Sequence, residues 1–116
     1  MSARLVAFLE DDDIEGVMGL YERDAVFVDL DGIHAGGGAI RLAHERFREA
    51  GLTLALNRST TVQVGDLALV QWSWTVSGPD GATAEGSSAE VLRRQSDGSW
   101  KFVIDNSDGP AIIGLV

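Results

Sequence analysis

Hydrophobic residues in the first fifty positions recur at helical spacing in three short segments. The spacing predicts a helix over residues 3–10, a second helix that Asp13 caps and that ends near Tyr21, and a third over residues 38–50, which Gly51 ends. Between the second and third helices, residues 25–30 are rich in valine and phenylalanine, and the Asp-Gly pair that follows them indicates a turn. The first half therefore predicts the order helix, helix, strand, helix.

In the second half, polar and apolar residues alternate, which is typical of β-strands with one buried face. We expect strands over residues 53–64, 67–77, 83–95 and 99–106, separated by turn sequences rich in glycine and aspartate. Strands joined by tight turns pair antiparallel. Helices followed by such a meander predict an α+β domain whose helices cover one face of the sheet. The 116 residues contain neither a linker nor a repeat, so we expect a single domain over residues 1–116.

The composition argues against several classes of partner. Cysteine is absent and only His34 and His44 are present, so we expect no disulfide and no multi-histidine metal site. The net charge of −9 repels phosphate backbones and argues against nucleic-acid binding. No run of about 18 apolar residues predicts a membrane span, and the apolar run at 5–9 is too short for a signal peptide. We therefore expect a cytoplasmic protein.

Several stretches carry a resemblance to a known family. Residues 13–29, with Asp-Ile-Glu-Gly and then Tyr-Glu-Arg-Asp-Ala-Val-Phe-Val-Asp, resemble the opening of ketosteroid isomerases, and the Gly-Ala-Ile-Arg helix start at 38–41 is also similar. Residues 65–70 and 90–106 resemble SnoaL-like proteins of the nuclear transport factor 2-like (NTF2-like) superfamily. The resemblance implies a cystatin-like cone, with three N-terminal helices on a curved, mostly antiparallel sheet around an apolar pocket. That fold hosts isomerases, cyclases, dehydratases, epoxide hydrolases and non-enzymes, so it assigns no activity by itself.

The resemblance implies three catalytic candidates. Asp29 falls on the position of the general base that removes a proton next to a carbonyl group. Tyr21 falls on a tyrosine that supports the oxyanion-binding network, and Glu90 falls where the isomerases keep a protonated carboxylic acid. Each has a plainer alternative: Asp29 faces solvent or bonds the following turn, Tyr21 is a core tyrosine bonded to a backbone carbonyl, and Glu90 makes an ion pair with an arginine on the outer face of the sheet.

One position departs from the family pattern. Counted back from Asp29 without gaps, the catalytic tyrosine of the isomerases corresponds to Leu5, which cannot donate a hydrogen bond. Loss of one such donor costs about 3 kcal/mol of transition-state stabilisation. The standard steroid isomerisation is therefore in question. His44, on the third predicted helix, is a candidate replacement for another tyrosine of the network, although a helical histidine is more often a packing or surface residue.

Ligand-contact candidates lie mainly on the predicted strands. Trp72 and Trp74 share one strand face, so they line the pocket together with Phe27 or lie together in a dimer interface on the outer face. Asp105 and Asn106, at the end of the last strand, are candidates for polar pocket contacts, or else they begin a turn. We expect Trp100 in the core and His34 in a loop, with a place at the pocket mouth as the alternative for His34. The three glycines at 36–38 are read as a hinge or a tight entry to the helix rather than as a phosphate site.

These observations predict a small-molecule pocket protein, with an isomerase or cyclase that acts next to the carbonyl of an apolar compound as the leading hypothesis. That chemistry requires no metal and no organic cofactor. The alternative is a non-catalytic ligand-binding or dimerisation module of the same fold. A weaker alternative is an epoxide-hydrolase-like enzyme, which needs an Asp–Arg–Asp set with Arg58 or Arg93 turned inward. We also expect a homodimer through the outer face of the sheet.

Overall fold

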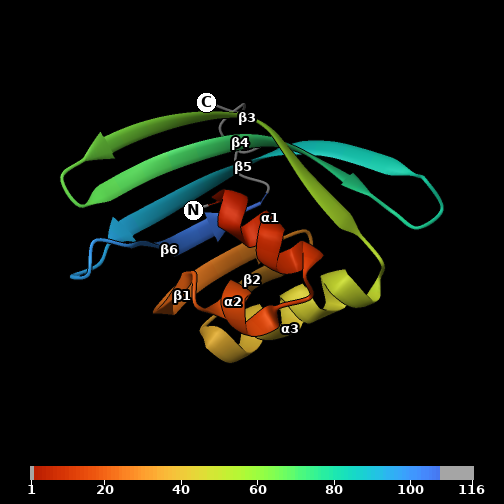
Figure 1. The fold of residues 1–116 in the computed structure, drawn as a ribbon, viewed down its shortest axis with the longest axis horizontal. Coiled ribbons are helices and arrows are strands. Elements are labelled where there is room, and N and C mark those ends of the chain that lie inside the picture. Colours follow the sequence, from red (N-terminus) through yellow and green to blue (C-terminus); the bar gives the residue numbers. More distant parts are fainter. Residues whose placement is uncertain (1, 108–116) are drawn as a thin grey trace.

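A computed structural model describes residues 2–107 of the chain (Figure 1). No helix among these residues is long and apolar enough to cross a lipid bilayer. The elements, in chain order, are α1 (Ser2–Glu10), α2 (Ile14–Met18), β1 (Tyr21–Asp29), β2 (Gly32–Ala35), α3 (Gly37–Glu49), β3 (Thr53–Val64), β4 (Leu67–Ser77), β5 (Thr83–Arg94) and β6 (Trp100–Asn106).

The six strands form one curved, mixed sheet in the order β2-β1-β6-β5-β4-β3. Strand β1 runs parallel to β6, and all other neighbouring pairs are antiparallel. Figure 1 shows β3, β4 and β5 arching over α1, whereas α3 lies beside β1 and β2, and α2 contacts both α1 and α3. The α+β prediction is confirmed. The expected block of three N-terminal helices is only approximate, because β1 and β2 separate α2 from α3.

Two local predictions were wrong. The second helix ends at Met18, because Gly19 caps it and the carbonyl of Leu20 already accepts a bond from the amide of Phe102 on β6. Tyr21 therefore opens β1 instead of ending a helix. The short strand β2 was not predicted. Gly32 has φ of 123°, a conformation open to glycine, which allows the chain to turn back at once and pair with β1.

The core lies between the helices and the face of the sheet that they cover, called the inner face below. Val17 of α2, Ile40 of α3 and Phe102 of β6 are fully buried there. Leu5 of α1 and Leu92 of β5 join the same cluster. The apolar faces of the helices and of the sheet thus pack together in one layer, which positions the remaining inner-face side chains.

The opposite, outer face of the sheet carries one apolar row that crosses all six strands. Its members are neighbours in the strand register: Ala35, Val26, Ile104, Val91, Leu69 and Val62. Exposure reaches 63% at Val62, 41% at Leu69 and 42% at Ile104. Such a contiguous exposed row is typical of a protein–protein contact surface.

Candidate functional site

A row of side chains crosses the inner face in the strand register. His34 of β2 pairs with Phe27 of β1, and Phe27 pairs with Asp105 of β6. Asp105 pairs with Glu90 of β5, and Glu90 with Val70 of β4. Directly paired residues on one face lie roughly 5 Å apart between their Cβ atoms. The sheet therefore gathers two carboxyl groups, an imidazole and a phenyl ring that are far apart in the sequence.

Tyr21 links this row to α3 through two buried hydrogen bonds. Its hydroxyl donates to Oδ2 of Asp105 at 2.6 Å and lies 2.9 Å from Nε2 of His44. Because the single hydroxyl proton goes to Asp105, Nε2 of His44 is the donor in the second bond. All three side chains are buried, with exposures of 4% to 6%. Tyr21, His44 and Asp105 therefore form one continuous network.

Burial sets the protonation states of this network. It raises the pKa of Asp105 to about 6, although the hydrogen bond from Tyr21 opposes the shift. It lowers the pKa of His44 to about 4, against the attraction of the Asp29 carboxylate. The pKa of Tyr21 is raised well above its usual range by burial and then by the charge of Asp105. Near neutral pH His44 is thus neutral and Tyr21 is protonated, whereas Asp105 can be either ionised or protonated.

Glu90 lies on the inner face and is 3% exposed. The predicted alternative, an ion pair with an arginine on the outer face, is therefore wrong. Arg93, on the same strand, pairs instead with Glu22 at 3.6 Å. The carboxyl groups of Glu90 and Asp105 are direct cross-strand neighbours in a buried setting, where two negative charges repel strongly.

Asp29 lies at the end of β1 on the inner face, two residues beyond Phe27. Its Oδ1 accepts a bond from Nε2 of His34 at 2.8 Å and one from the amide of Asp31 at 2.9 Å. The side chain keeps 24% of its surface exposed. Asp29 thus bonds the following turn, as the plainer alternative states, and it also forms a carboxylate–imidazole pair.

His34 was expected in a loop, with the pocket mouth as the alternative, and the preferred loop prediction was wrong. The residue lies on β2, and its ring stacks on Phe27 with centroids 5.9 Å apart. Phe27 in turn stacks on His44 at 4.9 Å. The three rings connect the Asp29 pair to the buried network. No local sequence signal identifies His34, since its role depends on its register opposite Phe27.

Trp72 and Trp74 lie on the inner face, in line with Ala68 and Val70 of β4. The ring of Trp74 packs directly on Gly86, where a Cβ atom would overlap it, and its Nε1 donates to the carbonyl of Ser107 at 3.0 Å. The expectation that both tryptophans share one face holds, and that face is the inner one. An outer-face interface built on them is excluded.

Several candidates lie apart from the cluster. Asn106 pairs with Val28 and Ala89 in a row of the opposite face, so its side chain does not join Asp105. Leu5, at 6% exposure, belongs to the core and offers no hydrogen-bond donor. Trp100 packs against the core, as expected, with Arg94 over its ring at 5.4 Å.

The arginine required for epoxide-hydrolase-like chemistry is not in place. Arg58 is exposed on the edge strand β3, and Arg93 is bound to Glu22. Within residues 2–107, neither Asp29 nor Asp105 forms an ion pair with an arginine. Nor does this part of the chain group three metal-binding side chains into a possible metal site.

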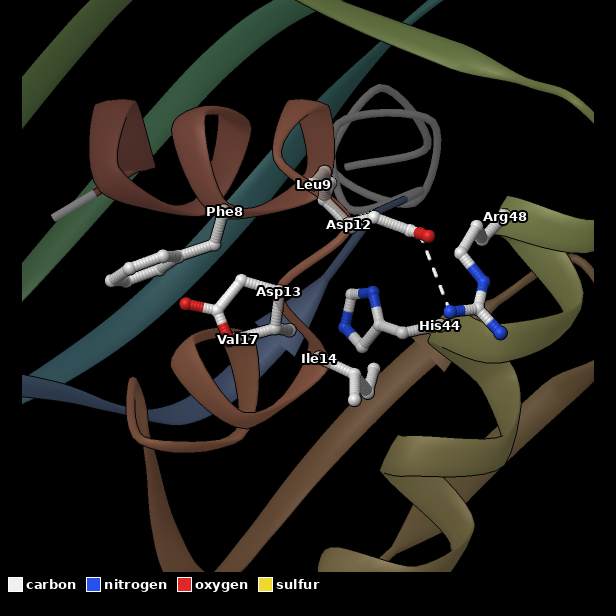
Figure 2. Close-up of a pocket in the computed structure, with 8 residues that line it drawn as sticks. All are labelled: Phe8, Leu9, Asp12, Asp13, Ile14, Val17, His44 and Arg48. Atoms are coloured by element: carbon white, nitrogen blue, oxygen red, sulfur yellow. Dashed lines mark ion pairs between the residues drawn. The ribbon is translucent and has the colours of Figure 1, made fainter.

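Two hollows accompany the cluster. A small cavity of about 10 Å³ lies between α1, α2 and α3, and Figure 2 shows the ring of His44 reaching into it near the Asp12–Arg48 ion pair. A groove of about 410 Å³ lies beside α1 and is lined by Arg4, Thr61, Gln63, Ala68, Val70, Leu92, Ser99 and Trp100. Neither is lined by Asp29, Trp72 or Trp74, so neither matches the apolar pocket, walled by the tryptophans, that the sequence analysis expects. The groove reaches the inner-face row at Val70.

Comparisons with solved structures support the fold. The chain is similar to a protein of unknown function with a cystatin-like fold from Nostoc punctiforme, with a TM-score of 0.81, 17% identity, and coverage of 92% of this chain and 84% of that one. An NTF2-like protein from Pseudomonas putida gives a TM-score of 0.79 at 22% identity, covering 91% and 79%. A candidate ketosteroid isomerase from Shewanella frigidimarina gives 0.75 at 17% identity, covering 90% and 89%.

Sequence comparison identifies the family. A search of curated proteins found no match. The family profile of the SnoaL-like domain matches residues 3–103, nearly the whole chain. The structural neighbours described as cystatin-like and NTF2-like agree with that match. The chain therefore belongs to the SnoaL-like domain family of the NTF2-like superfamily.

Proposed function

We propose that this protein is an acid–base enzyme that moves a proton next to the carbonyl group of a small apolar molecule. The observation that carries the proposal is the buried network of Tyr21, His44 and Asp105 beside Glu90. Natural proteins bury ionisable groups at a cost to stability, and such groups with shifted pKa values gather at functional sites. The raised pKa of Asp105, about 6, suits proton exchange near neutral pH.

In the proposed reaction, the carboxylate of Asp29 removes a proton from the carbon next to the carbonyl. The electron pair of the broken C–H bond forms a C=C bond, and the carbonyl π electrons move to oxygen, which gives an enolate. The same carboxylic acid returns its proton to carbon, at the original or a conjugated position, so no other reactant is consumed. His34 holds the Asp29 carboxylate at 2.8 Å, which supports its role as the positioned base.

Polar groups on the same face are suited to contact the substrate around the reacting carbon. Tyr21, Glu90 and Asp105 supply the polar contacts in this proposal, and Phe27, Trp72 and Trp74 supply apolar walls. An apolar substrate fits because most inner-face side chains around these polar groups are apolar or aromatic. The structural likeness to a candidate ketosteroid isomerase shows a shared fold and is consistent with this chemistry without assigning it.

One observation favours a second function, a non-catalytic ligand-binding module. Asp29 bonds the amide of Asp31 and lines neither hollow, as a purely structural carboxylate would. In either function the apolar row on the outer face supports a homodimer formed through the sheet. The cytoplasmic location stays a prediction of the sequence.

The test measures exchange of the protons next to the carbonyl of 2-tetralone in D₂O by NMR. We expect the enzyme to accelerate this exchange and Asp29→Asn to lower the rate about 100-fold or more. Asp24→Asn makes the same chemical change at an exposed position of the same strand and should leave the rate unchanged. Acceleration that survives Asp29→Asn would exclude Asp29 as the base. Saturable binding of 2-tetralone without any acceleration would favour the binding module.

A further inference from the structure

Two polar atoms on the inner face are buried without a hydrogen-bond partner. They are Nε1 of Trp72 and Oγ of Ser88, and neither has a partner within the part of the chain that the structure describes. Ser88 is only 4% exposed. More than about nine in ten buried polar groups in native proteins are hydrogen-bonded, and an unsatisfied one costs about 1–3 kcal/mol. Two of them at adjacent positions therefore require an explanation.

Trp74 shows that a tryptophan on this face of β4 can have its indole N–H hydrogen-bonded. It lies two residues farther along β4 on the same face, and its Nε1 is satisfied by the carbonyl of Ser107. Trp72 and Trp74 thus present the same donor group on the same face of the sheet, and only that of Trp74 is used within the described fold. The Trp72 donor is therefore buried and has no acceptor among the described residues.

The two residues that carry the unpartnered atoms are neighbours in the sheet. Trp72 and Ser88 are direct cross-strand partners on β4 and β5, so their side chains emerge side by side. Ser88 precedes Glu90 by two residues, and Trp72 follows Val70 by two residues, which places them about 7 Å from the carboxyl row. Val70 lines the groove and pairs with Glu90. The pair therefore lies one step beyond the end of the groove, along the same inner face.

We propose that Trp72 Nε1 and Ser88 Oγ form a binding site for the carbonyl oxygen of a neutral, apolar ligand. The proposal deepens the proposed function, on which it rests, by naming how the substrate is recognised.

The chemistry of the two atoms selects an oxygen acceptor. An indole N–H only donates, and a serine hydroxyl also donates when it meets an acceptor. A carbonyl oxygen has two lone pairs and can accept both bonds at once. A hydrocarbon would leave both donors unsatisfied, and a cationic group would face the N–H rather than an acceptor.

The surrounding charge favours a neutral ligand over a carboxylate. Glu90 and Asp105 are buried beside the pair, and a ligand carboxylate would bring a further negative charge into the same low-dielectric region. A ketone or ester meets the hydrogen-bonding requirement without this repulsion. The ligand class is therefore a neutral carbonyl compound whose apolar body extends toward Val70 and the groove.

The binding test compares three molecules of similar shape by calorimetry or NMR titration: 2-tetralone, the hydrocarbon tetralin, and 1,2,3,4-tetrahydro-2-naphthoate. We expect 2-tetralone to bind best. Trp72→Phe and Ser88→Ala should each weaken 2-tetralone binding about 3- to 10-fold, the range for one hydrogen bond, and leave tetralin binding unchanged. Ser87→Ala, on the opposite face of the same strand, should change neither. Equal affinity for the ketone and the hydrocarbon, or tighter binding of the carboxylate, would overturn the proposal.

A second measurement needs no ligand. Ser88→Ala removes a hydroxyl that has no partner among the described residues, so the melting temperature of the ligand-free protein should stay the same or rise. Ser107→Ala is the matched control, because its hydroxyl donates to the carbonyl of Val28 at 2.8 Å, and it should melt lower. If Ser88→Ala lowers the melting temperature as much as Ser107→Ala does, then Ser88 already has a protein partner and the site assignment is wrong.

These outcomes separate the two proposals. If the protein prefers the ketone through Trp72 and Ser88 but does not accelerate proton exchange in 2-tetralone, the carbonyl-oxygen site is supported and the enzymatic proposal is excluded. Proton exchange that depends on Asp29, with ketone affinity unchanged in Trp72→Phe and Ser88→Ala, supports the enzyme and removes the oxygen site.

Discussion

The hydroxyl of Tyr21 lies 2.6 Å from Oδ2 of Asp105, a residue 84 positions later in the chain. The contact exists because β1 and β6 are parallel neighbours and Tyr21 pairs in register with Phe102. The tyrosine ring packs against that of Phe102, with centroids 5.0 Å apart, and its hydroxyl reaches Asp105. One hydrogen bond thus joins the opening of the first strand to a carboxyl group buried in the last, and the bond to His44 adds the third helix.

Asp105 and His44 have opposite pKa shifts, so their contributions to the pH dependence of stability partly cancel in the wild-type protein. His44 has a pKa of about 4 in the folded protein against 6.5 for the free group, so the unfolded chain binds its proton more tightly and stability is lost as the pH falls from 6.5 to 4. Asp105 has a pKa of about 6 against 3.8, so the folded protein binds its proton more tightly and stability is lost as the pH rises from 3.8 to 6.

Single variants separate these two contributions. In His44→Gln the free energy of unfolding should fall as the pH rises from 4 to 6, and in Asp105→Asn it should rise over the same range, each by up to about 3 kcal/mol. Urea unfolding at several pH values measures both slopes. Asp24→Asn, at an exposed position, should follow the wild type. Identical slopes in the two variants would contradict the predicted shifts.

Removal of the Tyr21 hydroxyl should raise the pKa of Asp105 further. The bond from Tyr21 stabilises the ionised carboxylate, and Tyr21→Phe removes it while burial remains. NMR titration of the carboxyl carbon should therefore place the pKa of Asp105 above its wild-type value of about 6. The variant should also lose about 1–3 kcal/mol of stability, because it leaves a buried acceptor without its donor. An unchanged or lower pKa would mean that another donor serves Asp105.

A side chain at position 86 should disturb the inner face. A Cβ atom there would overlap the ring of Trp74, so Gly86→Ala should lower the free energy of unfolding by about 1–3 kcal/mol. Gly38→Ala is the matched control: a methyl group at this position would have no neighbouring atom within 4 Å, and alanine favours the helix in which it lies. Denaturant unfolding compares the two. Equal stability in both variants would show that Trp74 can move aside freely.

The apolar row on the outer face should mediate homodimer formation. Leu69 lies between Val91 and Val62 in this row and is 41% exposed, so Leu69→Lys places a charge where a second copy would make contact. Sedimentation at micromolar concentration should show a dimer for the wild type and a monomer for Leu69→Lys. Leu30→Lys is the control, because Leu30 is 91% exposed in the turn after β1 and outside the row. A monomeric wild type would contradict this prediction.

Local features of the sequence determined the strands of the second half. Residues 53–64 and 67–77 were predicted with the bounds that the structure has for β3 and β4, because alternation and glycine-containing turns act between near neighbours. The last two strands agree to within one residue at each end. The same local patterns placed Asp29, Glu90 and Asp105 on strands, where the structure has them.

Only the tertiary structure decided which of these residues meet. The strand register placed Asp105 between Phe27 and Glu90, turned Asn106 to the opposite face, and brought His34 to Asp29. The register also places Trp72 and Trp74 on the inner face. Alternation in the sequence shows only that both tryptophans share a face, and it does not show which of the two faces is buried. The parallel contact of β1 with β6 joins the two ends of the fold, and no short-range pattern in the sequence encodes such a pairing.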